Sequence, residues 1–332
     1  MKAMTQDRYG SADVLTLADV DMPAVGDDDV LIRVRAAGVG PEVWHLMTGR
    51  PYFVRLMGFG LRKPKARVVG RDVAGVVEAA GKDVTQFQLG DEVFGSCRGA
   101  YAEYASAGAG SEGGVGTSGV VALKPTNITF EQAAAVPTSA STALQGLRDA
   151  GGIRAGQSVL IIGASGGVGT FAVQLAKTFG ARVTGVCSTS KVDLVRSLGA
   201  DHVIDYTRED FAARGEHHDL ILDTAGRRSL AHLRRALTPR GTLVIVGGEG
   251  GGPWTGGFER QLWAPVVSRF VPQQLRPLTA VDRREDLLYL KDLIEAGKLT
   301  PVIDRTYRLD EAAKALANAD EGHGRGKKVI TV

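Results

Sequence analysis

The chain has 332 residues and a formal net charge of +3 at pH 7, a length that suggests two domains and a charge too small to favour nucleic-acid binding. Its two cysteines, Cys97 and Cys187, cannot build a disulfide framework and fit a reducing compartment. The first residues carry no apolar signal region, and no uncharged apolar run reaches membrane-spanning length. We therefore expect a cytoplasmic protein that neither binds nucleic acid nor crosses a membrane.

The first third of the chain has the alternating pattern of strands separated by turns. Strands are predicted over 30–36 and 73–79, and the turn at 90–95 leads into another. A short helix is predicted over 42–47, and the Gly-rich segment 108–119 is predicted to be an excursion between strands. Helical patterns follow over 131–136 and 141–147.

From residue 158 onward, short apolar runs alternate with helical segments. The predicted strands cover 159–162, 182–187, 202–206, 220–224, 242–246 and 274–279. Such alternation is typical of a parallel sheet that helices cover on both faces. A helix over 284–296 is expected to end at Gly297, and the tail from 302 to 332 to rejoin the N-terminal domain. The pair His217 and His218 is expected in an exposed turn before the fourth of these strands.

The most informative segment is 158–170, in which a buried strand runs into glycines and then a helical pattern. This order suits a dinucleotide pyrophosphate, which needs a sharp turn, close backbone approach and the N–H groups of a helix N-terminus. Gly163 permits the turn, Gly166 and Gly167 admit the phosphates, and Gly169 lets the helix pack near the strand. The candidate cofactor-binding residues here are Gly163, Ser165, Gly166, Gly167 and Val168.

The tip of the second strand indicates which dinucleotide is bound. An acidic residue about 20 positions on usually binds the ribose 2′-hydroxyl of NAD, but this tip holds Ser188, Thr189, Ser190 and Lys191 and no carboxylate. Hydroxyls and an ammonium suit a 2′-phosphate, which favours NADPH. Two alternatives stay open. The hydroxyls could simply cap the next helix, and the nearby carboxylate of Asp193 is an argument against a bound 2′-phosphate.

Motifs spread over nearly the whole chain resemble those of the zinc-independent medium-chain dehydrogenases/reductases of quinone oxidoreductase type. They lie at 90–95, 99–104, 133–144, 163–169, 198–206, 219–226, 297–304 and 326–332. The resemblance implies an α/β fold with a GroES-like β-rich domain and a six-stranded parallel Rossmann domain. We place the GroES-like substrate domain at 1–130 and 282–332 and the NADP(H)-binding domain at 131–281. Members of this family are usually homodimers, so the resemblance implies a homodimer. The hydrophobic periodicity of this chain does not itself indicate an oligomeric state.

Zinc is not expected, because the ligand positions of related zinc alcohol dehydrogenases hold other residues. Gly40 stands in place of a ligating Cys, and Gly70, Arg71 and Asp72 replace a Gly-His-Glu sequence. The segment 105–120, where a structural zinc would be held, has no cysteine. We therefore predict no metal.

The resemblance also implies side chains near substrate and cofactor. Gly40 stands where similar quinone reductases carry an Asn near the nicotinamide, which is a departure; His45 and Tyr52 lie about where those enzymes have tyrosines facing the substrate. His45 could donate or shuttle a proton, or simply pack or face solvent. Further cofactor contacts are implied for Thr142, Tyr206, Val246, Gly247, Gly248 and Lys327. Tyr206 could instead be a core aromatic, Lys327 a surface lysine, and Thr142 a helix-interior residue bonded to its own backbone.

The favoured function is an NADPH-dependent, metal-independent reductase that transfers hydride to a small hydrophobic quinone or α,β-unsaturated carbonyl. Saturated alcohols fit poorly, because removing their hydroxyl proton needs a base or Lewis acid. Trp254, Phe258 and Trp263 could form a lid over an apolar acceptor, or else belong to a partly ordered loop or a dimer contact. Two other hypotheses stay open: an NADPH-binding sensor or structural protein without turnover, suggested by Gly40, and a membrane-surface partner-binding protein, suggested by the apolar and basic segment 52–63.

Overall fold

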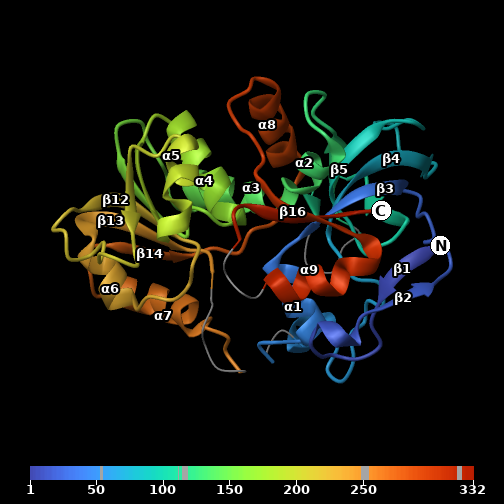
Figure 1. Ribbon diagram of the computed structural model, residues 1–332, viewed down its shortest axis with the longest axis horizontal. Coiled ribbons are helices and arrows are strands. Elements are labelled where there is room, and N and C mark those ends of the chain that lie inside the picture. The colour runs from blue at the N-terminus through green and yellow to red at the C-terminus, as the bar shows by residue number, and fades with distance from the viewer. Residues whose placement is uncertain (53–54, 111, 114–118, 248–253, 320–323) are drawn as a thin grey trace. The chain divides into compact units, whose positions relative to one another are not determined.

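The computed structural model describes residues 1–52, 55–110, 112–113, 119–247, 254–319 and 324–332. The chain forms two compact units (Figure 1). Unit 1 comprises Met1–Ser141 and Val281–Val332, and unit 2 comprises Thr142–Ala280. The sequence prediction places the boundaries of the functional domains between residues 130 and 131 and between residues 281 and 282, and these boundaries remain a prediction.

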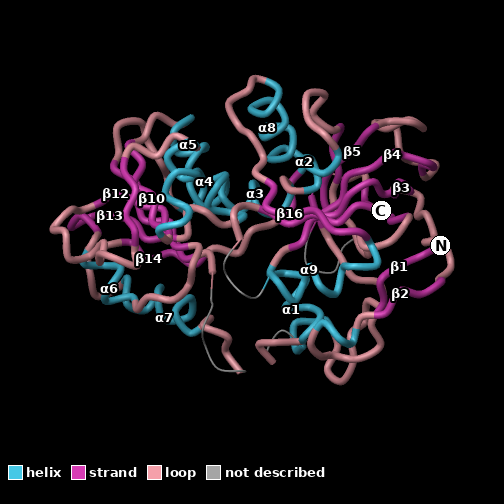
Figure 2. Tube along the Cα trace, in the orientation of Figure 1, coloured by secondary structure: helices cyan, strands magenta, loops and turns pink. Residues whose placement is uncertain are grey.

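Unit 1 is built on a seven-stranded sheet (Figure 2) in the order β16-β17-β3-β4-β5-β8, with β6 also paired to β3. All of its pairs are antiparallel except β16 with β17. The strands are β3 (Asp29–Val39), β4 (Asp72–Ala80), β5 (Glu92–Ser96), β6 (Tyr104–Gly108), β8 (Val121–Leu123), β16 (Ile303–Arg308) and β17 (Lys327–Thr331). The predicted return of the tail to the N-terminal sheet is confirmed, because β17 pairs with β3.

Smaller elements complete unit 1. Two short sheets pair β1 (Lys2–Thr5) with β2 (Thr16–Asp19), and β7 (Glu112–Gly113) with β15 (Asp282–Arg283). The helices are α1 (Pro41–Thr48), α2 (Phe130–Ala134), most of α3 (Pro137–Gln145), α8 (Arg284–Glu295) and α9 (Ala312–Ala319), with single turns η1 (Ala12–Val14), η2 (Arg55–Phe59) and η5 (Leu309–Glu311). Helix α9 packs against α1 and β17, which closes the apolar core over one side of the sheet.

Unit 2 is a six-stranded, fully parallel sheet in the order β11-β10-β9-β12-β13-β14. Its strands are β9 (Ser158–Ile162), β10 (Arg182–Cys187), β11 (His202–Asp205), β12 (His218–Asp223), β13 (Leu237–Ile245) and β14 (Gln274–Pro277). Its helices are α4 (Gly167–Thr178), α5 (Val192–Ser197), α6 (Leu230–Arg235) and α7 (Glu259–Ser268), with the turns η3 (Gly146–Ala150) and η4 (Thr189–Lys191). The predicted six-stranded parallel sheet is confirmed.

The burial of these strands explains their sequence. Val159, Leu160, Ile161 and Ile162 are all buried, because α4 and α5 lie on one face of the sheet and α6 and α7 on the other (Figure 1). A strand covered on both faces needs apolar side chains on both, so the pattern is a continuous apolar run instead of an alternation.

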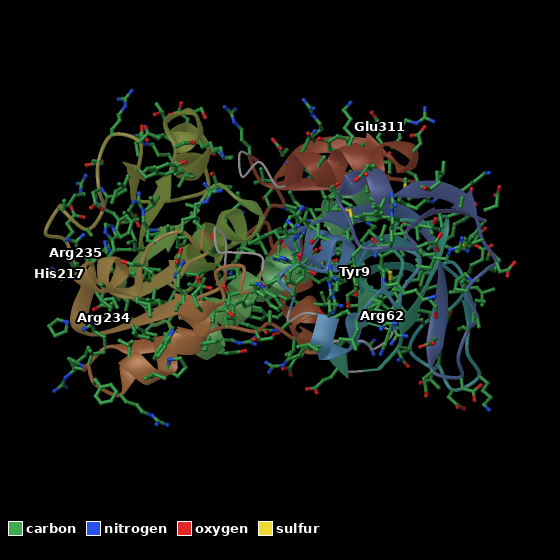
Figure 3. The ribbon with its side chains drawn as sticks, turned by 90° about the horizontal axis from the view of Figure 1, so that it is seen from below. Tyr9, Arg62, His217, Arg234, Arg235 and Glu311 are labelled. Carbon is green, nitrogen blue, oxygen red and sulfur yellow. The ribbon has the colours of Figure 1, made fainter. Side chains whose placement is uncertain are left out.

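The prediction of an exposed His217–His218 turn is correct for His217 and wrong for His218. His217 is exposed at the surface of unit 2 (Figure 3), whereas His218 is buried as the first residue of β12. His218 Nδ1 lies 2.9 Å from the Ser158 hydroxyl, and burial lowers the pKa of its imidazole. Within the described residues, no helix has both the length and the apolar character needed to cross a membrane.

Candidate active site

The glycine turn of unit 2 has the geometry that its sequence predicted. Gly163 follows β9 with φ of 82°, a conformation that L side chains rarely adopt. Helix α4 begins at Gly167, and its N-cap, Gly166, contributes no side chain that could cap the first N–H groups. At Gly169 a Cβ would overlap the Gly163 carbonyl oxygen and lie 2.7 Å from Ala164 Cα, so only glycine allows this approach of helix to strand. Ser165 and Val168 belong to the same turn.

This turn lies where the order of the parallel strands reverses. β9 is flanked by β10 on one side and β12 on the other, so the connections from β9 and β12 leave the sheet in opposite directions. The hydroxyl of Thr224, just after β12, donates to the Ile162 carbonyl across 2.8 Å. In open α/β sheets, ligands bind outside the carboxyl ends of the strands at such a reversal.

The carboxyl end of β10 carries the residues predicted to bind a 2′-phosphate, together with a carboxylate that the prediction missed. Asp205, the last residue of β11, pairs in register with Cys187 at the end of β10. Its carboxylate accepts a 2.5 Å hydrogen bond from the Thr189 hydroxyl, and that bond holds the Asp205 pKa below its usual value. Asp205 was missed because only the segment 188–191 was searched for an acid. Asp205 lies in the expected strand at 202–206, so pairing of that strand with 182–187 would have allowed it to be found.

Several alternatives for this region can be tested against the structure. Ser188 is the N-cap of η4 but makes no capping hydrogen bond to the described residues, so capping does not explain its hydroxyl. Lys191 is buried. Tyr206 is 47% exposed, so the alternative that it is a core aromatic is wrong. A contact of these residues with a cofactor stays a prediction.

The ends of β12 and β13 form the third part of the site in unit 2. The N–H groups of Val246 and Gly247 donate to the Asp223 carbonyl at 3.0 and 3.4 Å, whereas Gly248 lies outside the described residues. The fully buried Asp223 carboxylate is ion-paired with Arg260 of α7. Within the described chain, the buried Nε and Nη1 atoms of Arg260 have no hydrogen-bond partner. This ion pair was not predicted, because the sequence analysis did not predict helix α7, which carries Arg260.

Thr142 lies in α3 as the first residue of unit 2, where it is buried. Its predicted approach to the nicotinamide is untested. The predicted lid residues differ in exposure: Trp254 and Trp263 are exposed, whereas Phe258 is half-buried.

In unit 1, the predicted substrate contacts are His45, which lies in helix α1, and Tyr52, which follows the helix. His45 Nδ1 lies 2.8 Å from the Arg50 carbonyl oxygen, so this nitrogen is the protonated one, and the His45 ring packs edge-on to Trp44. Tyr52 stacks under the guanidinium of Arg55, 4.8 Å from its ring centre. Both side chains therefore have structural partners, and their contact with substrate remains a prediction.

A buried ion pair lies behind α1. Asp72, which is fully buried at the start of β4, meets the ammonium of Lys327 at 3.1 Å and accepts hydrogen bonds from the Thr138 N–H at 3.2 Å and hydroxyl at 2.5 Å. Burial opposes the charge of Lys327, yet Asp72 and Glu42 together raise its pKa. Lys327 is 4% exposed, so the alternative of a surface lysine is wrong. Its predicted reach to cofactor phosphates is untested.

The preceding residue, Arg71, belongs to a second ion pair. Its Nη2 lies 2.5 Å from the Asp282 carboxylate, which also accepts a 2.6 Å hydrogen bond from the Ser96 hydroxyl. Burial raises the pKa of the nearby Cys97 thiol well above its usual value, so this cysteine stays a neutral thiol.

These residues do not fit a catalytic zinc. A zinc site needs three protein ligands of thiolate, imidazole or carboxylate type with one open position. Here Gly40 has no side chain, Arg71 presents a cation and the Asp72 carboxylate is bound to Lys327. Within the described residues, no group of three His, Cys, Asp or Glu side chains could hold a metal ion.

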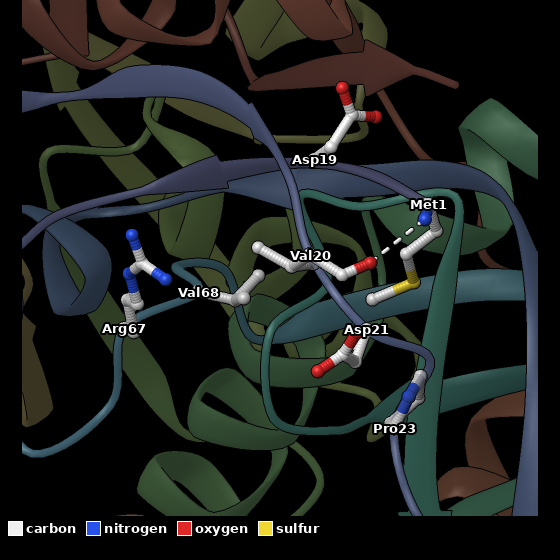
Figure 4. Close-up of a pocket in the computed structure, with 7 residues that line it drawn as sticks. All are labelled: Met1, Asp19, Val20, Asp21, Pro23, Arg67 and Val68. Carbon is white, nitrogen blue, oxygen red and sulfur yellow. Dashed lines mark hydrogen bonds between the residues drawn. The ribbon is translucent and has the colours of Figure 1, made fainter.

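A surface cavity of about 510 Å³ belongs to a different part of unit 1 (Figure 4). It is lined by Met1, Asp19, Val20, Asp21, Pro23, Arg67 and Val68. The Met1 amino group donates to the Val20 carbonyl at 2.8 Å at its edge. None of the predicted site residues lines this cavity.

Comparison with known proteins identifies both parts of the chain. Residues 26–143 match the alcohol dehydrogenase GroES-like domain, and residues 198–330 match the family described as zinc-binding dehydrogenase. The chain is 34% identical to 2-methylene-furan-3-one reductase of Solanum lycopersicum, over 99% of this chain and 79% of that protein. It is 33% identical to NADPH-dependent alkenal/one oxidoreductase, chloroplastic, of Arabidopsis thaliana, with the same coverage.

A solved structure agrees with these relatives. The quinone oxidoreductase from Coxiella burnetii superposes with a TM-score of 0.85 at 29% identity, covering 100% of this chain and 99% of that one. The predicted combination of a GroES-like domain and a six-stranded Rossmann domain is therefore confirmed. The chain belongs to the medium-chain dehydrogenases/reductases of quinone oxidoreductase type.

Proposed function

We propose that the protein is an NADPH-dependent, metal-independent reductase of quinones or α,β-unsaturated carbonyl compounds. The observation that carries this proposal is the glycine turn from Gly163 to Gly169, placed at the strand reversal of a six-stranded parallel sheet. The names of the tomato, Arabidopsis and Coxiella relatives support an oxidoreductase acting on enones or quinones.

The residues of unit 2 fit the cofactor. The uncapped N-terminus of α4 offers N–H groups and a positive dipole end to a pyrophosphate. Ser188, Thr189, Lys191 and Tyr206 are our candidates for the 2′-phosphate, with the ionised Asp205 as an opposing charge. When bound, NADPH supplies a hydride from its nicotinamide ring.

The residues of unit 1 support chemistry without a metal. The positions that would have to ligate zinc hold Gly40 and two ion-paired side chains, Arg71 and Asp72. Quinones and enones suit such a site, because the negative charge left by hydride addition delocalises onto an oxygen and needs only a proton. The protein's part is then to hold the acceptor and to provide that proton. Tyr52 and His45 remain our proposed substrate contacts.

The experiment is NADPH oxidation followed at the nicotinamide absorbance with a panel of quinones, enals and enones. We expect turnover of at least one class, preference for NADPH over NADH, and no change on adding a chelator or zinc. Tight NADPH binding without turnover of any acceptor would instead favour the sensor hypothesis, and loss of activity with chelator would contradict metal independence.

We further propose a homodimer formed through unit 2. Strand β14 is an edge of its sheet, pairing only with β13 in the described chain, and the neighbouring helix α7 exposes apolar side chains. These are Leu262, Trp263, Val266 and, just after the helix, Phe270. An open edge beside an exposed apolar patch is typical of a surface that a second chain covers.

A further inference from the structure

The buried ion pair between Asp223 and Arg260 connects two segments of unit 2. Asp223 is the last residue of β12, and it is fully buried. Its Oδ1 atom accepts hydrogen bonds from the Ala225 N–H at 3.3 Å and the Gly226 N–H at 3.2 Å. Its Oδ2 atom is bound by Arg260 in the first turn of α7. One carboxylate therefore shapes the turn after β12 and also holds that turn to α7.

The next residue of α7 holds the neighbouring loop. The side-chain amide of Gln261 donates a 3.3 Å hydrogen bond to the carbonyl of Val246, which directly follows β13. The N–H of Val246 donates in turn to the Asp223 carbonyl at 3.0 Å. Two consecutive residues at the start of α7 thus bind the ends of two adjacent strands, β12 through Arg260 and β13 through Gln261.

The local structure at either end of the ion pair does not require Arg260. A cation in the first turn of a helix is opposed by the positive end of the helix dipole, so Arg260 does not stabilise α7 through its position. The turn after β12 does not need a charge either, because the side-chain oxygen of an asparagine could accept the same two N–H bonds. What the charged pair adds is the connection from this turn to α7.

The two loops lie on the side of the glycine turn opposite the predicted 2′-phosphate site. Residues 188–191 follow β10, which flanks β9 on one side, whereas Asp223 and Val246 are at the ends of β12 and β13 on the other side. The Thr224 hydroxyl joins the end of β12 to the Ile162 carbonyl at the end of β9. A dinucleotide with its pyrophosphate after β9 and its adenosine over β10 extends its nicotinamide half over β12 and β13.

We propose that Arg260 and Gln261 are positioning residues, which hold the loops after β12 and β13 in the arrangement that binds the nicotinamide half of NADPH. This inference rests on the proposed function, in which unit 2 binds NADPH. Loops that are already ordered bind a ligand more tightly, because binding then includes no cost of ordering them. Loops that adopt the binding arrangement for only a fraction of the time lower the apparent affinity by that fraction.

The test compares NADPH with adenosine 2′,5′-bisphosphate, which carries the 2′-phosphate but has no nicotinamide. Isothermal titration calorimetry on the full chain measures both dissociation constants. Arg260→Met removes the tie to the turn after β12, and NADPH should bind about tenfold more weakly if the loops then keep the binding arrangement about a tenth of the time. Gln261→Ala removes a single hydrogen bond and should weaken NADPH binding roughly fivefold. Binding of the bisphosphate should change by less than about twofold in both variants.

A double variant separates positioning from stability. Arg260→Met leaves the Asp223 carboxylate buried without its cation and should lower the melting temperature. Asp223→Asn combined with Arg260→Met removes both charges, so the melting temperature should recover in part while NADPH binding stays weak. Arg182→Met is the matched control: it changes an exposed arginine at the amino end of β10, and both dissociation constants and the melting temperature should be unchanged.

The possible failures are distinct. If Arg260→Met and Gln261→Ala are folded and bind NADPH as the wild type does, the two residues are structural and the proposal is wrong, although the proposed function stands. An equal loss of affinity for both ligands would overturn it as well, because the effect would not be confined to the nicotinamide half.

Two further results decide the remaining cases. If NADPH affinity recovers together with the melting temperature in the double variant, Arg260 acts through stability alone and the proposal is wrong. If Arg260→Met does not fold, Gln261→Ala decides the question by the same comparison of the two ligands. A wild type that binds neither ligand contradicts the proposed function, and the positioning role with it.

Discussion

The carboxylate of Asp72 lies 3.1 Å from the ammonium of Lys327, and this pair joins the first residue of β4 to the first residue of β17 inside unit 1. The two residues are far apart in sequence, and both side chains are withdrawn from solvent. Each compensates a charge that the apolar core could not otherwise hold. The pair therefore ties the C-terminal strand to the N-terminal part of the sheet.

Removing one partner should destabilise the protein far more than removing both. Lys327→Met leaves Asp72 buried without its cation, and we expect the free energy of unfolding to fall by about 3–5 kcal/mol. The double variant Asp72→Asn with Lys327→Met should recover part of this loss. Denaturant unfolding of the two single variants and the double variant measures the coupling, and strictly additive losses would contradict it.

The same pair predicts a loss of stability at alkaline pH. The pKa of Lys327 is raised above its ordinary value of 10.5. Its contribution is thus complete below that value and is lost as pH rises through the higher folded-state pKa. Unfolding curves of the wild type should weaken in this range, and Lys327→Met should lack this component of the pH dependence. An identical alkaline profile in both proteins would argue against it.

Two glycines of the turn should respond differently to alanine. At Gly166 the nearest atom to a new Cβ is the Gly163 carbonyl oxygen at 3.4 Å, so the fold accepts the methyl group. The methyl would stand among the N–H groups of the α4 N-terminus, and we expect NADPH affinity to fall at least about tenfold with little change in melting temperature. Binding titrations and thermal melts of the same samples test this separation.

At Gly169 the methyl group meets backbone that cannot move aside. Gly169→Ala should therefore lower stability by roughly 1–3 kcal/mol as well as weaken NADPH binding. Gly110→Ala is the matched control, because its Cβ would meet nothing within 4 Å. Equal melting temperatures for the Gly166 and Gly169 variants would show that the approach of α4 to β9 is not as tight as described.

The parts of the fold that local pattern determines could be predicted from the sequence. The run 159–162 is apolar because the strand is covered on both faces, and the following glycines are needed for a turn that other residues cannot make. Both signals act within a few residues. The six strands and the glycine turn were therefore found in the sequence.

The site features that were missed depend on pairing between distant segments. Asp205 reaches Thr189 only because β11 pairs in register with β10, and Glu42 meets Lys327 only because β17 returns to β3. His218 was expected in an exposed turn, whereas the Ser158 hydroxyl on the neighbouring strand gives it a buried partner. No local pattern carries this information.

Asp205 should set the strength of NADPH binding. Its pKa is lowered by the Thr189 hydrogen bond, so it is ionised at neutral pH beside the predicted 2′-phosphate site. Asp205→Asn removes that charge and its repulsion of a phosphate, so NADPH should bind roughly fivefold tighter with NADH binding unchanged. Asp193→Asn removes an exposed charge of α5 that has no bond to Thr189 and should have a smaller effect. Weaker NADPH binding in Asp205→Asn would instead make the carboxylate an orienting group for Thr189.

The exposed apolar side chains beside β14 predict how the dimer can be broken. Phe270 is 83% exposed and Leu262 lies on the adjoining helix α7, so a carboxylate at either position would remain solvated in a monomer but be buried in the proposed dimer. We expect Leu262→Asp with Phe270→Asp to convert a dimeric wild type into a monomer, measured by light scattering after size-exclusion chromatography. Leu89→Asp is the matched control, since Leu89 is as exposed but belongs to unit 1. A monomeric wild type, or a double variant that stays dimeric, would show that this surface does not join two copies of the chain.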